Sequence, residues 1–274
     1  MTEDVWLAVI GLAAGLLGGL LGIGGSIVMI PALTELFGPR QHLYQAAALI
    51  VNFFVAAPAV VQHVRAMAVD VSVLRGLIPG AVVGAVAGVA CSELSLFSGT
   101  GSLYLTGAFG CFLFYAAGAD ICSAFSRGPQ GDGRRGTDAA VREVRPLRVA
   151  LLVGLPTGIL SGLLGVGGGV LAVPLQRRVF GIEVRSAIAN SAAMIVALSL
   201  VGGGMKNAAI AIHHPDLTWW QPARLALYLI PMAIVGSFIG ARLTHMLPTR
   251  GLRGAFALVL LVAGGRMVMR AYGG

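Results

Sequence analysis

Polar residues that could contact a small anion stand within the apolar parts of this sequence, and most of them are neutral. Hydroxyl and amide groups donate hydrogen bonds without the desolvation penalty of a full charge, so they suit a sulfonate or carboxylate in an apolar setting. The sequence therefore indicates an anion site without a strong fixed charge. The candidates are Ser26, Asn52, Thr157, Ser161, Asn190, Ser191, Ser199 and Asn207, with Lys206 at the end of an apolar segment.

Two glycine runs interrupt long apolar segments at equivalent places in the chain. Gly22-Ile23-Gly24-Gly25 in the first half recurs as Gly165-Val166-Gly167-Gly168-Gly169 in the second. Consecutive glycines favour a helix break, and a helix that restarts beyond the break has unpaired N–H groups and a positive dipole end. We expect the restarts at Ser26 and Gly169, and such ends hold anions.

The two breaks are expected to meet near the middle of the membrane and to form one shared anion site. In this prediction Asn190 and Ser191 line the same cavity and Asn52 is their weaker counterpart. Asn52 and Asn190 could equally serve as hydrogen bonds between helices. The predicted contacts of the anion are Gly24, Gly25 and Ser26 on one side and Gly167, Gly168 and Gly169 on the other.

Lys206 is the only lysine of the chain and adjoins Asn207 at the end of its apolar segment. It could attract an anion at one mouth of the site, or it could be a solvated charge at a helix end. Both interpretations stay open from sequence. Glu35, Glu93 and Asp120 also fall near segment ends, where a side chain can reach the membrane interface.

The composition places the chain in a lipid bilayer. Of its 274 residues, 57% are hydrophobic and 11% are charged, against roughly 25% charged in an ordinary soluble domain. The apolar runs are long enough to cross a hydrocarbon core. They are 5–37, 43–61, 71–91, 102–125, 148–180, 187–207, 223–245 and 252–272.

These segments form two homologous halves of four. Besides the glycine runs, Leu77-Ile78-Pro79 recurs as Leu229-Ile230-Pro231, and Gly107-Ala108-Phe109 recurs as Gly254-Ala255-Phe256. The sequence thus predicts an all-α polytopic membrane protein with an N-terminal membrane repeat (1–125), a basic cytoplasmic linker (126–147) and a C-terminal membrane repeat (148–274). Each repeat opens with a broken helix, which either spans the membrane or re-enters it.

The distribution of arginine favours inverted repeats, because cytoplasmic loops carry an excess of basic residues. If both broken segments return to their own side, the linker, the loops around Arg178 and Arg250, and the short loop near Arg65 all lie inside. Arg266 and Arg270 fit this arrangement poorly. No basic residue precedes the apolar run that begins at Val5, so we do not expect a cleaved signal peptide there.

Several function classes are not supported by the residues. The net charge of +8 is spread over short segments between apolar runs, which argues against nucleic-acid binding. The sequence has no phosphate-binding loop for ATP, no paired carboxylates or nucleophile with a base, and no metal-ligand spacing. We therefore expect neither an enzyme nor a cofactor or metal, and any transport must run on gradients.

Taken together, the two glycine motifs resemble those of the TauE/SafE sulfite-exporter family of bacterial membrane permeases. The resemblance covers nearly the whole chain and rests on Gly22 to Pro31, on Gly165 to Pro174 and on the basic central loop. It departs in one place: the family often has Ala-x-x-Thr-Ser after each glycine helix. Here Ala187 to Ser191 reads Ala-Ile-Ala-Asn-Ser, and Ala46 to Ile50 reads Ala-Ala-Ala-Leu-Ile.

The resemblance implies a multi-pass protein of the bacterial inner membrane that exports or takes up small anions by a gradient-driven mechanism. Sulfite, sulfonates, related sulfur oxyanions and organic acids are the implied substrates. A proton or sodium could be the coupling ion, and the sequence does not decide whether either is. The alternative is a channel-like pore or a carrier for another small solute. Sequence leaves the substrate, the direction of transport and the oligomeric state open.

Overall fold

The computed structural model describes residues 2–94, 102–125, 145–213, 217–243 and 249–272. Within these ranges the regular structure is entirely helical, as the composition predicts. A π-helical turn, Ala150–Gly154, joins α6 to α7. The helices are α1 (Thr2–Leu21), α2 (Ser26–Phe37), α3 (Gln41–Arg65), α4 (Val71–Ser92), α5 (Ser102–Phe125), α6 (Pro146–Val149), α7 (Leu155–Leu164), α8 (Gly169–Phe180), α9 (Val184–His213), α10 (Gln221–Leu243) and α11 (Thr249–Tyr272).

Six helical stretches of the described residues are long and apolar enough to cross a membrane. They comprise α1, α3, α4, the continuous stretch from α6 to α7, α9 and α10. The prediction of an all-helical, multi-pass membrane protein is therefore confirmed. The predicted basic linker lies mostly outside the described residues, and α6 begins at Pro146, close to the predicted start of the second half.

Both glycine runs break their helices where the sequence predicts. α1 ends before Gly22, whose φ of 64° is left-handed, and Gly24 follows with a φ of 82°. In the second run Gly165, Gly167 and Gly168 have φ values of 71°, 73° and 82°. A residue with a Cβ is strained in this region, so glycine is what permits the sharp turn. The helices restart at Ser26 and Gly169, as expected.

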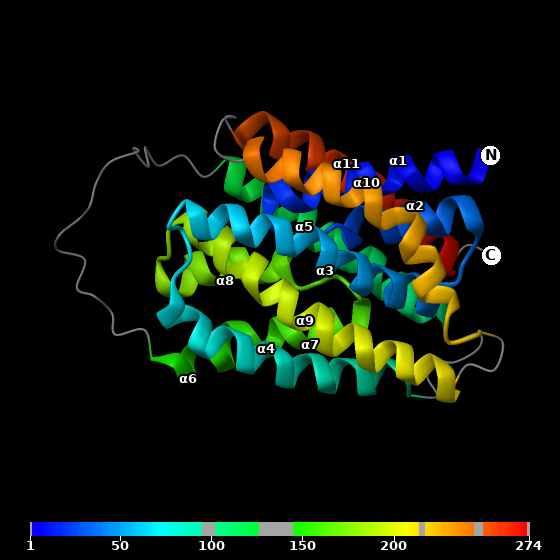
Figure 1. Ribbon diagram of the computed structural model, residues 1–274, viewed down its shortest axis with the longest axis horizontal. Helices are drawn as coiled ribbons and strands as arrows, with labels where there is room; N and C mark the ends of the chain where they lie inside the picture. The colour runs from blue at the N-terminus through cyan, green and yellow to red at the C-terminus, as the bar shows by residue number, and fades with distance from the viewer. Residues whose placement is uncertain (1, 95–101, 126–144, 214–216, 244–248, 273–274) are drawn as a thin grey trace.

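Equivalent helices of the two halves run in opposite directions (Figure 1). α3 and α9 run antiparallel, and so do α4 and α10. Both termini lie at one end of the molecule, whereas the second half begins with α6 at the other end. This is the geometry that an inverted repeat requires.

Each half packs its first helix against the third long helix of the other half. In α1, a Cβ built on Gly11 would lie 2.5 Å from the carbonyl oxygen of Leu229 in α10, and Gly15 and Gly19 meet the α10 backbone as closely. Gly84 and Gly88 of α4 meet the backbone of α7 in the same way. The predicted role of these glycines in close helix packing is confirmed, because small residues let membrane helices touch at the backbone.

The arginines that fit an inverted arrangement poorly are paired with an acid. Arg266 Nη2 lies 2.7 Å from Glu35 Oε2, and Arg270 Nε lies 3.4 Å from Glu35 Oε1. Arg270 also donates from Nη1 to the carbonyl oxygen of Thr34, at 2.7 Å. These contacts join α11 to the end of α2 and compensate part of the positive charge.

Gly15→Ala should lower the thermal unfolding midpoint of the detergent-solubilised protein, because the new methyl would overlap the carbonyl of Ala233. Overpacking of this kind costs about 1–3 kcal/mol. The control is Gly204→Ala, since a Cβ at Gly204 meets nothing within 4 Å. Equal midpoints for the two variants would contradict the close approach of α1 and α10.

Candidate functional site

The two glycine breaks lie against each other. A Cβ on Gly169 would overlap the carbonyl oxygen of Gly22 and would lie 2.5 Å from the Cα of Ile23. Built Cβ atoms on Gly24 and Gly167 would both contact the side chain of Asn52, at 3.2 Å from Oδ1 and 2.8 Å from Nδ2. The geometry thus brings together the glycines that the sequence predicts to face each other, with Asn52 between them.

Asn52 caps the restarted helix α2. Its Oδ1 accepts hydrogen bonds from the backbone N–H groups of Gly25 (2.9 Å) and Ser26 (3.2 Å), and its Nδ2 donates to Ser26 Oγ at 3.1 Å. All three residues are buried, so these bonds satisfy donors that water cannot reach. Asn52 is therefore a structural centre of the first break and not merely the weaker counterpart of Asn190.

In the part of the chain that the structure describes, no side-chain amide is seen to cap the second break as Asn52 caps the first. The N-terminus of α8 follows Gly168, a residue with no side chain, and the position equivalent to Asn52 is Ile195, whose Cγ2 lies 3.6 Å from a Cβ built on Gly167. Thr157 of α7 stands beside Gly168, with its Cγ2 2.7 Å from a built Cβ. The α8 end therefore keeps the dipole and first-turn donors that an anion can use.

Buried polar side chains without a partner gather on the helices around the breaks. Each has side-chain oxygen or nitrogen atoms that are shielded from solvent and make no hydrogen bond in the structure, which costs about 1–3 kcal/mol for each group. Gln45 lies directly against the second break, since its Cβ is 2.8 Å from a Cβ built on Gly165. Among the described residues this group includes Gln41 and Gln45 of α3, Thr157 of α7, and Ser191 and Ser199 of α9.

Asn190 makes its hydrogen bonds away from the glycine breaks. Its Nδ2 donates to Gln176 Oε1 at 3.2 Å, and its Oδ1 accepts from the backbone N–H of Asp70 at 2.9 Å. These bonds tie α9 to α8 and to the start of α4. Of the two interpretations of Asn190, the structure supports the hydrogen bond between helices. Its neighbour Ser191 is buried with an unpartnered hydroxyl and stays a candidate contact.

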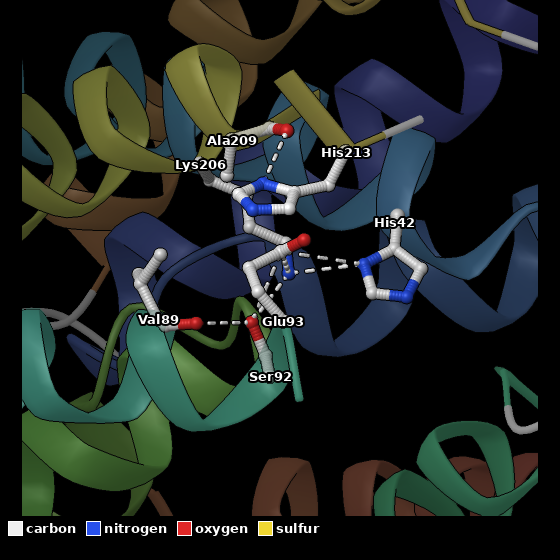
Figure 2. A network of polar contacts seen from close by, with 7 residues as sticks. All are labelled: His42, Val89, Ser92, Glu93, Lys206, Ala209 and His213. Atoms are coloured by element: carbon white, nitrogen blue, oxygen red, sulfur yellow. Dashed lines mark hydrogen bonds and ion pairs between the residues drawn. The ribbon is translucent and has the colours of Figure 1, made fainter. Parts of the chain in front are cut away.

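Lys206 belongs to a buried polar cluster (Figure 2). Its Nζ lies 2.7 Å from Glu93 Oε1, 2.6 Å from Ser92 Oγ and 3.1 Å from His42 Nδ1. The Lys206 side chain has no exposed surface, so the interpretation as a solvated charge is wrong. Nor is its charge uncompensated, because Glu93 neutralises it.

Sequence reasoning missed the partners of Lys206. Glu93 was expected to reach the membrane interface, but its side chain is only 9% exposed and points inward to Lys206. The sequence did contain a signal for this pair. A lone lysine in an apolar segment needs an acidic partner, and Glu93 lies at the end of another apolar segment. Burial acts to raise the pKa of Glu93, but the contact with His42 and the charge of Lys206 outweigh it and hold that pKa well below its usual range.

The described residues contain no group of three or more His, Cys, Asp or Glu side chains placed to hold a metal ion. What they do contain is a pair of apposed helix breaks, one of them uncapped, with unpartnered hydroxyl and amide groups nearby. A family model matches residues 7–267. This chain belongs to the sulfite exporter TauE/SafE family.

Curated relatives support a transporter. The chain is 32% identical to the probable membrane transporter protein MamO of Magnetospirillum gryphiswaldense and 30% identical to MamO of Paramagnetospirillum magneticum, over 95% of its own length. It spans only 44% of each of these longer relatives. It is also 27% identical to the probable membrane transporter protein YunE of Bacillus subtilis, across 97% of that protein. No solved structure matches this TauE/SafE chain.

Asn52→Ala should destabilise the protein by about 1–2 kcal/mol, the usual cost of removing a helix cap. The amides of Gly25 and Ser26 should also exchange hydrogen faster, because both lose their acceptor. Asn207→Ala is the matched control, since the hydrogen bond that Asn207 makes among the described residues is to Gly203 on its own helix. Unchanged exchange at Gly25 and Ser26 in the Asn52 variant would contradict the capping role.

Proposed function

We propose that this family member is a gradient-driven secondary transporter for small anions in the inner membrane of a bacterium. The substrate class is a sulfur oxyanion or a sulfonate, such as sulfite, or a small organic acid. The anion binds between the two glycine breaks, held chiefly by the N-terminus of α8. Family membership supports the transporter class, and the geometry of the breaks supports the anion.

The difference between the two helix restarts carries this proposal. At α2 the buried donors of Gly25 and Ser26 are already bonded to Asn52, whereas at α8 none of the described side chains is seen in that place. An anion near Gly169 would complete the missing cap and could also accept from the unpartnered hydroxyls of Thr157 and Ser191. Neutral donors and a helix dipole bind an anion while leaving it free to depart.

The arrangement of the halves suggests how access alternates. α1 and α4 each pack along a helix of the opposite half through glycine, so a body that tilts during transport would combine helices of both halves. The breaks lie where the halves meet, and in an inverted repeat such a tilt exposes a central site to the two sides in turn. We propose that the repeats are inverted across the membrane, with the linker and the loops near Arg178 and Arg250 in the cytoplasm.

Transport by the purified protein in liposomes tests the proposed function. The panel contains radiolabelled sulfite, thiosulfate, methanesulfonate and acetate, offered under an imposed proton or sodium gradient. We expect accumulation of at least one anion above its external concentration. Uptake that only equalises the two concentrations would identify a channel-like pore, and no uptake of any of the four would contradict the proposal.

Gly169→Ala in the same assay probes the site. The added methyl would separate the two breaks, so the rate should fall at least about tenfold while the protein still inserts and folds. Gly204→Ala, whose new methyl meets nothing, should transport like the parent. Equal rates for the Gly169 and Gly204 variants would remove the break contact from the transport site.

The orientation can be tested with single cysteines placed next to Arg178 and Arg250 in a background without Cys91, Cys111 and Cys122. Both positions should be shielded from an impermeant thiol reagent applied outside intact cells, because inverted repeats put both loops in the cytoplasm. Reaction of both cysteines from outside would favour eight full crossings.

A further inference from the structure

Gln45 of α3 lies against the glycine break of the opposite half. A Cβ built on Gly165 would lie 2.8 Å from Gln45 Cβ and 2.9 Å from its Cγ, so the Gln45 side chain runs alongside the break. Gln45 is completely buried. Two residues further along the run, a Cβ built on Gly167 would contact Asn52 of the same helix. One face of α3 therefore borders the second glycine run.

The first break has a hydrocarbon at the equivalent place. In the alignment that superposes Gly22 on Gly165, Gln45 corresponds to Ile188. Ile188 Cγ2 lies 2.6 Å from a Cβ built on Gly22, so Ile188 and Gln45 occupy matching places in the two halves. Close packing at this place therefore does not require an amide.

The Gln45 amide has unused hydrogen-bonding capacity. Its Oε1 and Nε2 are both buried and find no partner among the described residues, and the same holds for Gln41, one turn earlier on α3. Asn52 differs from them, because its amide is bonded to Gly25 and Ser26. Buried amides nearly always have partners. Two unpartnered amides on the face that borders the break therefore point to an occupant that supplies the partners.

The two polar atoms of an amide require different partners. Nε2 carries two N–H donors, and the oxygen atoms of an anion can accept from them. Oε1 only accepts, so it needs a group that donates a hydrogen bond. A fully deprotonated oxyanion has no such group. The occupant that satisfies both atoms of Gln45 thus combines acceptor oxygens with a donor of its own.

We propose that Gln45 is a specificity-determining residue that selects small anions carrying a hydroxyl group. This inference rests on the proposed function, in which the charged end of the anion lies at the N-terminus of α8. The hydroxyl group of the anion donates to Gln45 Oε1, and Gln45 Nε2 donates to an oxygen of the anion. Such an anion is either a 2-hydroxy carboxylate or a sulfur oxyanion that carries one proton.

Selection follows from the cost of an unsatisfied acceptor. An anion with a methyl group in place of the hydroxyl fills the same space but leaves Oε1 without a donor, so the site rejects it. Glycolate and propionate form one such pair, and hydrogen sulfite and methanesulfonate form another. A buried water molecule is the competing occupant, because water also donates and accepts. With water bound to Gln45, the two members of each pair would bind alike.

The test measures binding of these four anions to the detergent-solubilised protein. Binding is followed by the rise of the thermal unfolding midpoint with anion concentration at constant ionic strength, because a ligand of the folded state stabilises it. The buffer is mildly acidic, so that sulfite carries one proton. The parent should bind the hydroxyl-bearing member of at least one pair about tenfold or more tighter than its methyl counterpart. A preference within one pair alone distinguishes the hydroxy acid from the protonated oxyanion.

Gln45→Met should abolish this preference, because methionine has a similar shape and no amide. The variant should bind glycolate or hydrogen sulfite more weakly, whereas its affinity for the methyl counterpart should stay the same or rise. A purely structural role of Gln45 would weaken both members of a pair equally. The matched control is Ile188→Met, which places the same side chain against Gly22 and should keep the preference of the parent.

Three results would overturn the assignment of Gln45. They are equal affinity of the parent for both members of both pairs, an unchanged preference in Gln45→Met, and an equal loss of preference in Ile188→Met. The first is measured without any variant, so the proposal can fail even if Gln45→Met does not fold. Failure of the parent to bind any of the four anions would instead contradict the proposed function, and this inference with it.

Discussion

The hydrogen bonds that the backbone N–H groups of Gly25 and Ser26 donate to Asn52 Oδ1 are the interaction on which the interior of this protein depends. A helix broken inside an apolar environment leaves donors that no water can satisfy, and each unsatisfied group costs several kcal/mol in hydrocarbon. Asn52 meets that requirement for α2 and at the same time lies against Gly167 of the other half. One side chain therefore stabilises the first break and sets its distance from the second.

The second break differs from the first, because Asn52 bonds to the start of α2 and not to the start of α8. Where α2 has Asn52, α8 has Ile195 nearby, and we propose that the anion completes its first turn. In the proposed function, the duplicated sequence provides one structural end at α2 and one anion-binding end at α8. Such a division is reasonable for a carrier, because a site with two equally free helix ends would bind an anion tightly and release it slowly.

Charged side chains of the helices form ion pairs with side chains of other segments. Lys206 and Glu93 neutralise each other between the halves, and Arg266 and Arg270 are offset by Glu35 between α11 and α2. The pairing of Lys206 with Glu93 determines whether Lys206 can bind an anion.

The sequence by itself determined the helical membrane class, the positions of both breaks and the restarts at Ser26 and Gly169, because apolar length and consecutive glycines act locally. It also predicted the packing role of Gly15 and Gly84, since small residues at helical spacing have few other uses in a membrane.

The roles of Asn52, Asn190 and Lys206 were decided only by the tertiary structure. Each is a polar side chain whose role depends on a partner far away in the chain: the backbone of Gly25, the amide of Gln176 and the carboxylate of Glu93. Hydrogen bonds and ion pairs between distant segments leave no periodic pattern, so only the fold can show which donor meets which acceptor.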